Sequence, residues 1–182
     1  VFIMAQGLLL IDIQNDYFPG GAMELVNPLA ALDNAEKLLA HFRKQNLPMI
    51  HVQHINVREG ATFFLPNTEG VKIHERLTPQ ADEDVVIKHT PSSFYQTDLA
   101  KILKDKQIDQ LVVAGMMTHM CIDTTVRAAK DYGLEITVAE DACATKDLVF
   151  DGESLPAATV QKVFMAGLNG MFAKVMKTEE LL

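Results

Sequence analysis

The chain has 182 residues, of which 48% are hydrophobic and 22% are charged, and its formal net charge is −8. This composition is typical of a globular protein, so we expect residues 1–182 to form a single domain with a sizeable core. The sequence has no cluster of Lys and Arg and no apolar run of about 18 residues, which excludes nucleic acid and membrane as expected partners.

Strands and helices are expected to alternate along the first half of the chain. The opening segment, VFIMAQ, is too short and too uncharged for a signal peptide. A continuous apolar run at residues 7–13 predicts a strand buried on both faces of a parallel sheet. A helix is expected from Pro28, with Asn27 as its N-cap. Residues 47–55 predict the next strand, and an irregular segment follows at 56–83.

The same alternation resumes after this irregular segment. Strands are expected at 84–89, 110–115 and 135–142, with a short last strand at 173–177, and helices at 97–107, 118–132 and 156–169. Strands that alternate with helices indicate a parallel α/β sheet with helices on both faces, a three-layer α-β-α arrangement. The chain shows no linker and no break in composition, which agrees with one domain.

Three chemically useful side chains stand at the carboxyl ends of predicted strands: Asp12, Lys88 and Cys121. Because parallel sheets of this kind bind ligands beyond the carboxyl ends of their strands, we expect these side chains to meet. Asp12 lies inside an apolar run, where an unpaired carboxylate would be costly, and Lys88 is its natural partner. A purely structural ion pair is the alternative explanation of that pairing.

Cys121 lies in the first turn of the helix that is expected after the fourth strand. A thiol attacks only as the thiolate, and a helix N-terminus favours negative charge, so the position suits a nucleophile. With Asp12 to take the thiol proton and Lys88 to orient that carboxylate, the three residues form a triad for covalent catalysis without histidine. A buried core residue is the alternative for Cys121. Thr118 can cap the same helix and would then compete with an oxyanion for the N–H of Cys121.

The second cysteine, Cys143, has no helix start or base beside it in the sequence and is expected in the core. Two cysteines in a chain of this length can form one disulfide at most, which points to a cytoplasmic location. No Gly-x-Ser-x-Gly motif occurs in the chain, which argues against a serine hydrolase.

Three segments resemble the isochorismatase-like cysteine hydrolases: LLLIDIQNDYFPGGAMEL, VVIKHTPSSFYQTDL and LVVAGMMTHMCIDTTVRAAKDYGLEITVAEDACAT. That family includes nicotinamidases, N-carbamoylsarcosine amidase and ureidoacrylate amidohydrolase. The resemblance covers nearly the whole chain and implies a six-stranded parallel sheet in a Rossmann-like order. It also implies the triad Asp12, Lys88 and Cys121. Finally, it implies a cis peptide between Met116 and Met117, with an oxyanion held by the backbone N–H groups of Met117 and Cys121.

The sequence also departs from parts of this family. Members that hydrolyse the vinyl ether of isochorismate do so without this cysteine, so Cys121 favours amide chemistry. Nicotinamidases carry a metal-binding Asp-x-His pair after the second strand, and here Val52 stands where the Asp would be. His51 and His54 are an odd number of positions apart, so on a strand they point to opposite faces and cannot hold one metal. We therefore expect no metal and no other cofactor.

Weaker candidates for contact with a small-molecule substrate are Gln14, Phe18, His54, Phe94 and His119. Tyr17 and Phe18 can form an apolar wall or pack under a loop, and His54 can bind substrate or be a satisfied core residue. The segment 56–83 is longer than a simple connection needs to be. Its TFFLP stretch can cover the site as a lid or dock against another subunit, and a homo-oligomer is expected.

These features predict a hydrolase that cleaves an amide-type C–N bond of a small molecule through a thioester on Cys121. Two alternatives stay open. One is hydrolysis of an isochorismate-like vinyl ether, and the other is a catalytically silent protein that keeps the fold. The reactivity of the thiol and a panel of amides distinguish the three.

Overall fold

The computed structural model describes residues 5–182, so the first four residues of the segment VFIMAQ lie outside the described part. Six parallel strands form one sheet in the order β3-β2-β1-β4-β5-β8. They are β1 (Ala5–Ile11), β2 (Met49–His54), β3 (Asp84–Lys88), β4 (Ile108–Met116), β5 (Glu135–Ala144) and β8 (Lys174–Met176). This confirms the expected six-stranded parallel sheet in a Rossmann-like order.

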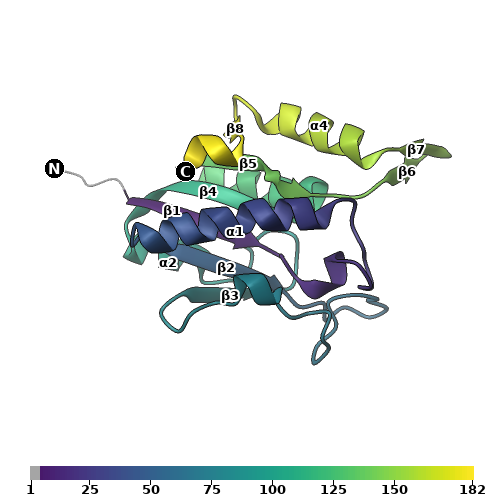
Figure 1. Cartoon of the computed structure of the whole chain (residues 1–182), viewed down its shortest axis with the longest axis horizontal. Coiled ribbons are helices and arrows are strands. Elements are labelled where there is room, and N and C mark those ends of the chain that lie inside the picture. Colours follow the sequence, from purple (N-terminus) through teal and green to yellow (C-terminus); the bar gives the residue numbers. More distant parts are fainter. Residues whose placement is uncertain (1–4) are drawn as a thin grey trace.

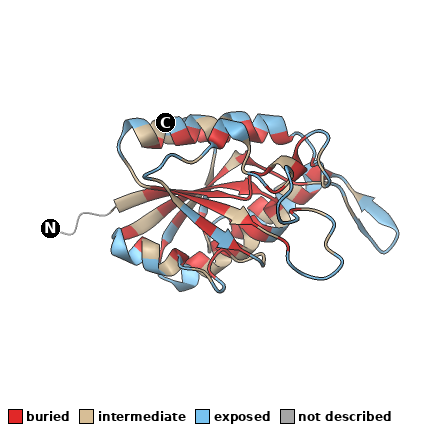
Figure 2. Cartoon of the chain, turned by 90° about the horizontal axis from the view of Figure 1, so that it is seen from below, coloured by how far each residue is buried: buried red, intermediate tan, exposed pale blue. Residues whose placement is uncertain are grey.

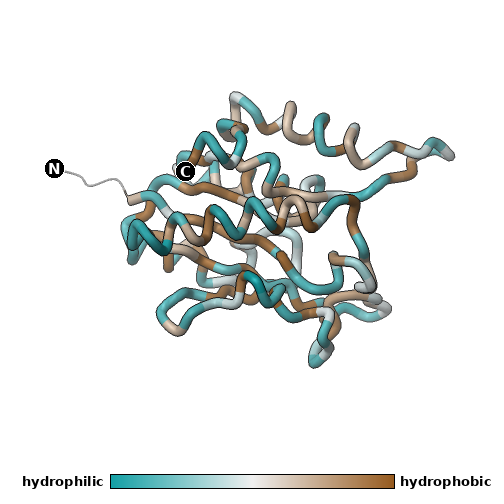
Figure 3. The backbone as a smooth tube through the Cα atoms, in the orientation of Figure 1, coloured by the Kyte–Doolittle hydropathy of each residue, from teal (hydrophilic) through white to brown (hydrophobic). Residues whose placement is uncertain are grey.

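Strand β1 lies inside the sheet and is buried on both faces, as its apolar run predicts. Leu8 and Leu10 belong to the hydrophobic core on one face, and Leu9 and Ile11 belong to the core on the other. Successive side chains of a strand point to opposite faces, so a strand covered on both sides must be apolar throughout. The buried strands between two layers of helices are visible in Figure 2, and the apolar colouring of the same strands in Figure 3.

Four helices cover the sheet and complete the three layers (Figure 1). They are α1 (Pro28–Lys44), α2 (Leu99–Asp105), α3 (Asp123–Asp131) and α4 (Ala157–Leu168). Apolar side chains of α1 build the core on one face, and those of α2, α3 and α4 contribute to the core on the other. No helix in residues 5–182 is long and apolar enough to cross a membrane.

Two helix starts differ from the sequence-based expectation. Pro28 is the first residue of α1 and Asn27 is its N-cap residue, both as expected, but Asn27 adopts a left-handed conformation and its side chain makes no capping hydrogen bond. The single helix expected at 118–132 is divided into a π-helical turn, η3 (Thr118–Ile122), and α3. Cys121 therefore lies in the wider turn ahead of α3.

Several short elements connect the sheet. The 3₁₀ turns are η1 (Asn15–Tyr17), η2 (Glu75–Leu77) and η4 (Thr178–Leu181). The antiparallel hairpin β6 (Leu148–Phe150) and β7 (Glu153–Leu155) has no counterpart in the sequence-based expectations. It projects from the body of the molecule beside α4 (Figure 1).

Candidate active site

Asp12, Lys88 and Cys121 meet at the carboxyl ends of β1, β3 and β4. The Lys88 Nζ atom lies 2.9 Å from Asp12 Oδ2 and 3.2 Å from Cys121 Sγ. The exposed fractions of these residues are 0% for Asp12, 1% for Lys88 and 4% for Cys121. The three side chains that the sequence places at strand ends therefore form one buried cluster with an ammonium at its centre.

The Lys88 ammonium contacts four groups. Besides Asp12 and Cys121, its ammonium contacts His54 Nδ1 at 2.7 Å and donates to the Thr90 carbonyl at 3.0 Å. Burial lowers the pKa of Lys88, but the Asp12 carboxylate and the Cys121 sulfur more than offset this, so its pKa lies above the ordinary value. Lys88 is therefore a fixed positive charge at neutral pH.

The pairing of Asp12 and Cys121 suits transfer of a proton between them. Apart from the Lys88 ammonium and the Cys121 thiol, no group in residues 5–182 donates a hydrogen bond to either Asp12 oxygen. Burial and the nearby Asp12 carboxylate raise the pKa of the Cys121 thiol well above its usual range, while Lys88 opposes them. The resting cysteine is therefore a protonated thiol beside a carboxylate whose other hydrogen-bond donor is the Lys88 ammonium.

The backbone before Cys121 adopts an unusual path. The Met116–Met117 peptide is cis, as the family resemblance implied. Gly115 has a φ of 141°, and a Cβ there would lie 2.0 Å from the Ile11 carbonyl oxygen, so only glycine fits where β4 passes β1. The chain then enters η3 with Met117 as its N-cap residue.

Thr118 does not compete for the N–H of Cys121. Its hydroxyl donates instead to the carbonyl of Ala144 and to the side chain of Gln161, and no side chain caps η3. The predicted cap at Thr118 is therefore wrong, because this hydroxyl faces the end of β5 and α4.

Aromatic side chains enclose the cluster. The Phe64 ring lies 4.6 Å from that of Tyr17 and 5.9 Å from that of His54, measured between centroids. Burial, together with the nearby negative charge of Asp12, raises the pKa of Tyr17 well above its usual value. Burial and the Lys88 ammonium lower the pKa of His54 to about 4. Both groups are therefore neutral at pH 7, and the wall of the site carries no charge on these side chains.

The other predicted contact residues are occupied elsewhere. Gln14 is fully buried, and its amide donates to the carbonyls of His54 and Val71. Phe18 packs on His74, and Phe94 stacks on Tyr132. His119 is hydrogen-bonded to Thr145 Oγ1 at 2.7 Å. Of the five weaker candidates, His54 is the one that touches the cluster.

A metal would compete with Lys88 for the same ligands. Asp12, His54 and Cys121 offer ligand atoms that lie within 4.8 Å of one another. Each of these groups also lies within 3.2 Å of the Lys88 ammonium, which stands where an ion would have to sit. The donor set therefore fits a lysine-centred cluster better than a metal site.

His51 belongs to a different network on β2. Its Nε2 atom lies 2.8 Å from Glu83 Oε1, and Arg43 contacts Glu83 Oε2 at 2.7 Å. His54 contacts Lys88 instead. The two histidines therefore do not converge, as their odd spacing on a strand predicts.

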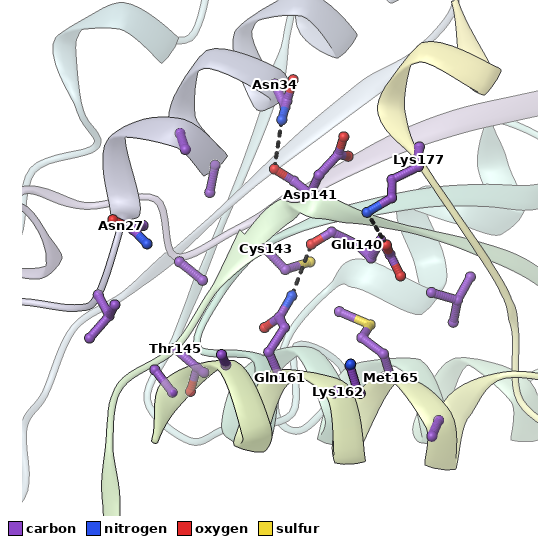
Figure 4. Close-up of a pocket in the computed structure, with 18 of the residues that line it drawn as sticks. Asn27, Asn34, Glu140, Asp141, Cys143, Thr145, Gln161, Lys162, Met165 and Lys177 are labelled. Atoms are coloured by element: carbon purple, nitrogen blue, oxygen red, sulfur yellow. Dashed lines mark hydrogen bonds and ion pairs between the residues drawn. The ribbon is translucent and has the colours of Figure 1, made fainter. Parts of the chain in front are cut away.

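A cleft of about 660 Å³ lies away from the cluster, between α1, the end of β5 and α4 (Figure 4). Cys143 lines it, and its Sγ donates to the Ala139 carbonyl. Burial raises the pKa of Cys143 to about 12, so this thiol is not poised for attack. None of Asp12, Lys88 and Cys121 lines this cleft, which lacks a paired nucleophile and base.

Comparisons with known proteins show which family the chain and its fold resemble. The family model described as Isochorismatase domain matches residues 6–180. The isochorismatase family protein YddQ of Bacillus subtilis is 52% identical over 179 residues, which cover 98% of this chain and 99% of YddQ. The nicotinamidase of Escherichia coli is 26% identical over 175 residues, which cover 76% of this chain and 82% of that enzyme. The crystal structure of an isochorismatase hydrolase, so described, from Oleispira antarctica superposes on this chain with a TM-score of 0.93 at 49% sequence identity. The superposition covers 97% of this chain and 95% of that chain.

Proposed function

Because this chain belongs to the isochorismatase family of hydrolases, we propose that it hydrolyses an amide-type C–N bond of a small molecule through a thioester on Cys121. The observation that carries the proposal is the position of the Lys88 ammonium, 2.9 Å from Asp12 and 3.2 Å from Cys121. A buried nucleophile, a base without other donors and a fixed cation are the groups that covalent acyl transfer needs.

In the proposed mechanism, Asp12 takes the proton of the Cys121 thiol, and the thiolate attacks the carbonyl carbon of the amide. The oxyanion that forms accepts hydrogen bonds from the backbone N–H groups of Met117 and Cys121. Protonated Asp12 gives its proton to the leaving nitrogen, and ammonia or an amine departs. Asp12 then takes a proton from water, whose oxygen attacks the thioester. The acid is released, and the proton returns to Cys121.

Lys88 acts throughout as an electrostatic support. Its positive charge offsets the negative charge as this moves from Asp12 to Cys121 and back. Since a thiolate in a buried site would otherwise be strongly disfavoured, the ammonium makes the transfer of the proton feasible.

The charge of the site favours an uncharged amide over an isochorismate-like acid. Lys88 is the one buried Lys or Arg in residues 5–182, and its ammonium already faces Asp12, Cys121 and His54. A substrate that carries carboxylates would find no spare buried cation to pair with, and burying an unpaired charge is costly. The nicotinamidase among the relatives is an amide hydrolase, which supports the same choice.

The test combines turnover with detection of the intermediate. A panel of small primary and secondary amides is scored by release of ammonia or amine, with an isochorismate-like vinyl ether in parallel. We expect turnover of at least one amide, a thioester adduct by intact mass, and loss of both in Cys121→Ala and Cys121→Ser. Full turnover by Cys121→Ala, or turnover of the vinyl ether alone, would contradict the proposal.

We also propose a homo-oligomer in the cytoplasm. The hairpin β6–β7 presents Val149 and Phe150 with exposed fractions of 72% and 77%, and large exposed apolar side chains that lie together mark contact surfaces. Both cysteines are buried and unpaired, which suits a reducing compartment.

A further inference from the structure

The reactive groups are closed off from solvent in this structure, so a substrate can reach them only if a covering segment moves. Cys121 is 4% exposed, and Asp12 and Lys88 are less exposed still. Between residues 57 and 70 the chain is otherwise exposed or half-buried, and Phe64 is its one buried residue. We propose that residues 57–70 form a gate segment, and that Asp16 is a positioning residue that latches Phe64 over the site. The proposal rests on the proposed function only in taking Cys121 as the nucleophile.

Asp16 binds the gate segment from the turn that follows β1. Its Oδ2 atom accepts the N–H of Phe64 at 2.7 Å, and its Oδ1 atom accepts the N–H of Ala22 at 3.1 Å. Its own N–H donates to the Gly70 carbonyl at 2.9 Å. Hydrogen bonds to a carboxylate are stronger than those between neutral groups, and Asp16 is itself buried. One side chain therefore contacts Phe64 directly while its backbone holds the end of the gate segment.

Phe64 needs this support because its backbone is strained. Its φ is 55°, in the left-handed region that a bulky side chain rarely adopts. The N–H is held by Asp16, and the carbonyl accepts the N–H of Asn56 at 2.8 Å. The ring packs on Tyr17 and His54, whose imidazole contacts Lys88. Release of the N–H would let the backbone relax, and the ring would then leave the wall of the site.

Gly70 offers an independent way to disturb the latch. A Cβ on Gly70 would lie 2.0 Å from Asp16 Oδ1, so any side chain there must displace the carboxylate. Its φ lies outside the left-handed region, so alanine suits the local backbone and the effect of Gly70→Ala comes from this contact alone. Gly70→Ala should therefore act like Asp16→Asn.

The test measures access to Cys121 without relying on catalysis. Asp16→Asn, Gly70→Ala and Phe64→Ala are compared with the unaltered protein and with Lys37→Gln, an exposed change on α1 outside the gate segment. The rates of alkylation of Cys121 and Cys143 by iodoacetamide and by the larger N-phenylmaleimide are followed by peptide mapping. We expect the Cys121 rate to rise about tenfold or more in the three gate variants, and further for the larger reagent, because loss of a charge-assisted hydrogen bond shifts an opening equilibrium by about that factor.

Two further readouts separate a gate from general loosening. In the gate variants the pH profile of Cys121 alkylation should keep its midpoint while the rate rises at every pH, and Cys143 should be alkylated as slowly as in Lys37→Gln. Equal acceleration of Cys143, a shifted midpoint, or a Cys121 rate within twofold of the parent in folded Asp16→Asn and Gly70→Ala would each overturn the latch. If alkylation rises as expected while no amide is hydrolysed, the gate stands and the proposed function fails.

Discussion

Replacing Asp12 with Asn should make Cys121 more reactive toward an alkylating agent while nearly abolishing catalysis. The carboxylate and the sulfur lie within 4.8 Å, and the negative charge of Asp12 raises the pKa of the thiol. At that separation two unit charges repel by about 3 kcal/mol if the effective dielectric constant is about 20. Removing the repulsion corresponds to roughly a hundredfold more thiolate at a given pH. The Lys88 ammonium, which no longer pairs with Asp12, also lowers the pKa of the thiol.

Turnover should respond in the opposite direction. Asparagine cannot accept the thiol proton or return it to the leaving nitrogen, and removal of a general acid–base group typically costs about 10²–10⁴-fold in rate. Asparagine also tolerates the left-handed backbone at this position, where φ is 54°, so the change adds no backbone strain. The opposite signs of the two effects are what distinguish a base from a structural partner of Lys88.

The assay follows the iodoacetamide rate at Cys121 between pH 6 and 9 and the turnover of an amide found in the panel. Asp98→Asn serves as the charge-matched control, because Asp98 is exposed at the start of α2 and its side chain caps nothing. If Asp12→Asn alkylates more slowly than the parent, or keeps more than a tenth of the turnover, the assignment of Asp12 as the base is refuted.

Two further predictions concern acid stability and assembly. Folding lowers the pKa of His54 from 6.5 to about 4 and that of Glu83 from 4.5 to about 2. The folded state therefore binds fewer protons than the unfolded chain in these pH ranges. The urea concentration at the unfolding midpoint should decrease as the pH is lowered from 6.5 to 4, and decrease again as it is lowered from 4.5 to 2. Glu83→Gln should weaken the second decrease, and a midpoint that stays constant from pH 7 to 3 would contradict the prediction. If the hairpin β6–β7 is a subunit contact, Phe150→Ser should lower the mass measured by light scattering. Val163→Ser, a change at another exposed apolar residue on α4, should not lower it, and an unchanged mass in Phe150→Ser speaks against the contact.

The sheet and the position of the cluster were predictable because each depends on local patterns. The apolar run of β1 must be buried on both faces, and side chains at the carboxyl ends of parallel strands share one edge. Asp12, Lys88 and Cys121 could therefore be placed near one another before any coordinates. No such pattern in the sequence indicates that the predicted helix is divided into η3 and α3.

The walls of the site were less predictable because they depend on contacts between distant segments. Gln14 was expected to face substrate, but its amide is hydrogen-bonded to the backbone of two other segments. Asp16 was not singled out, since its partner Phe64 lies in a segment without periodicity. The one available signal was the apolar TFFLP stretch inside a long polar loop. It indicated a lid or an interface, but not the residue that binds this stretch.

The left-handed backbone at Asp12 also limits how this site can change during evolution. Few residue types adopt that conformation readily, chiefly Gly, Asn, Asp and His. Of these, only Asp is both a base and an anion that pairs with a buried lysine. Glu is chemically the most similar residue, but at this position it would hold the backbone in a strained conformation. Lineages that lose the base should therefore tend to show Asn or Gly at this position, and sequences that carry them would be the first to examine for members of the fold that have become silent.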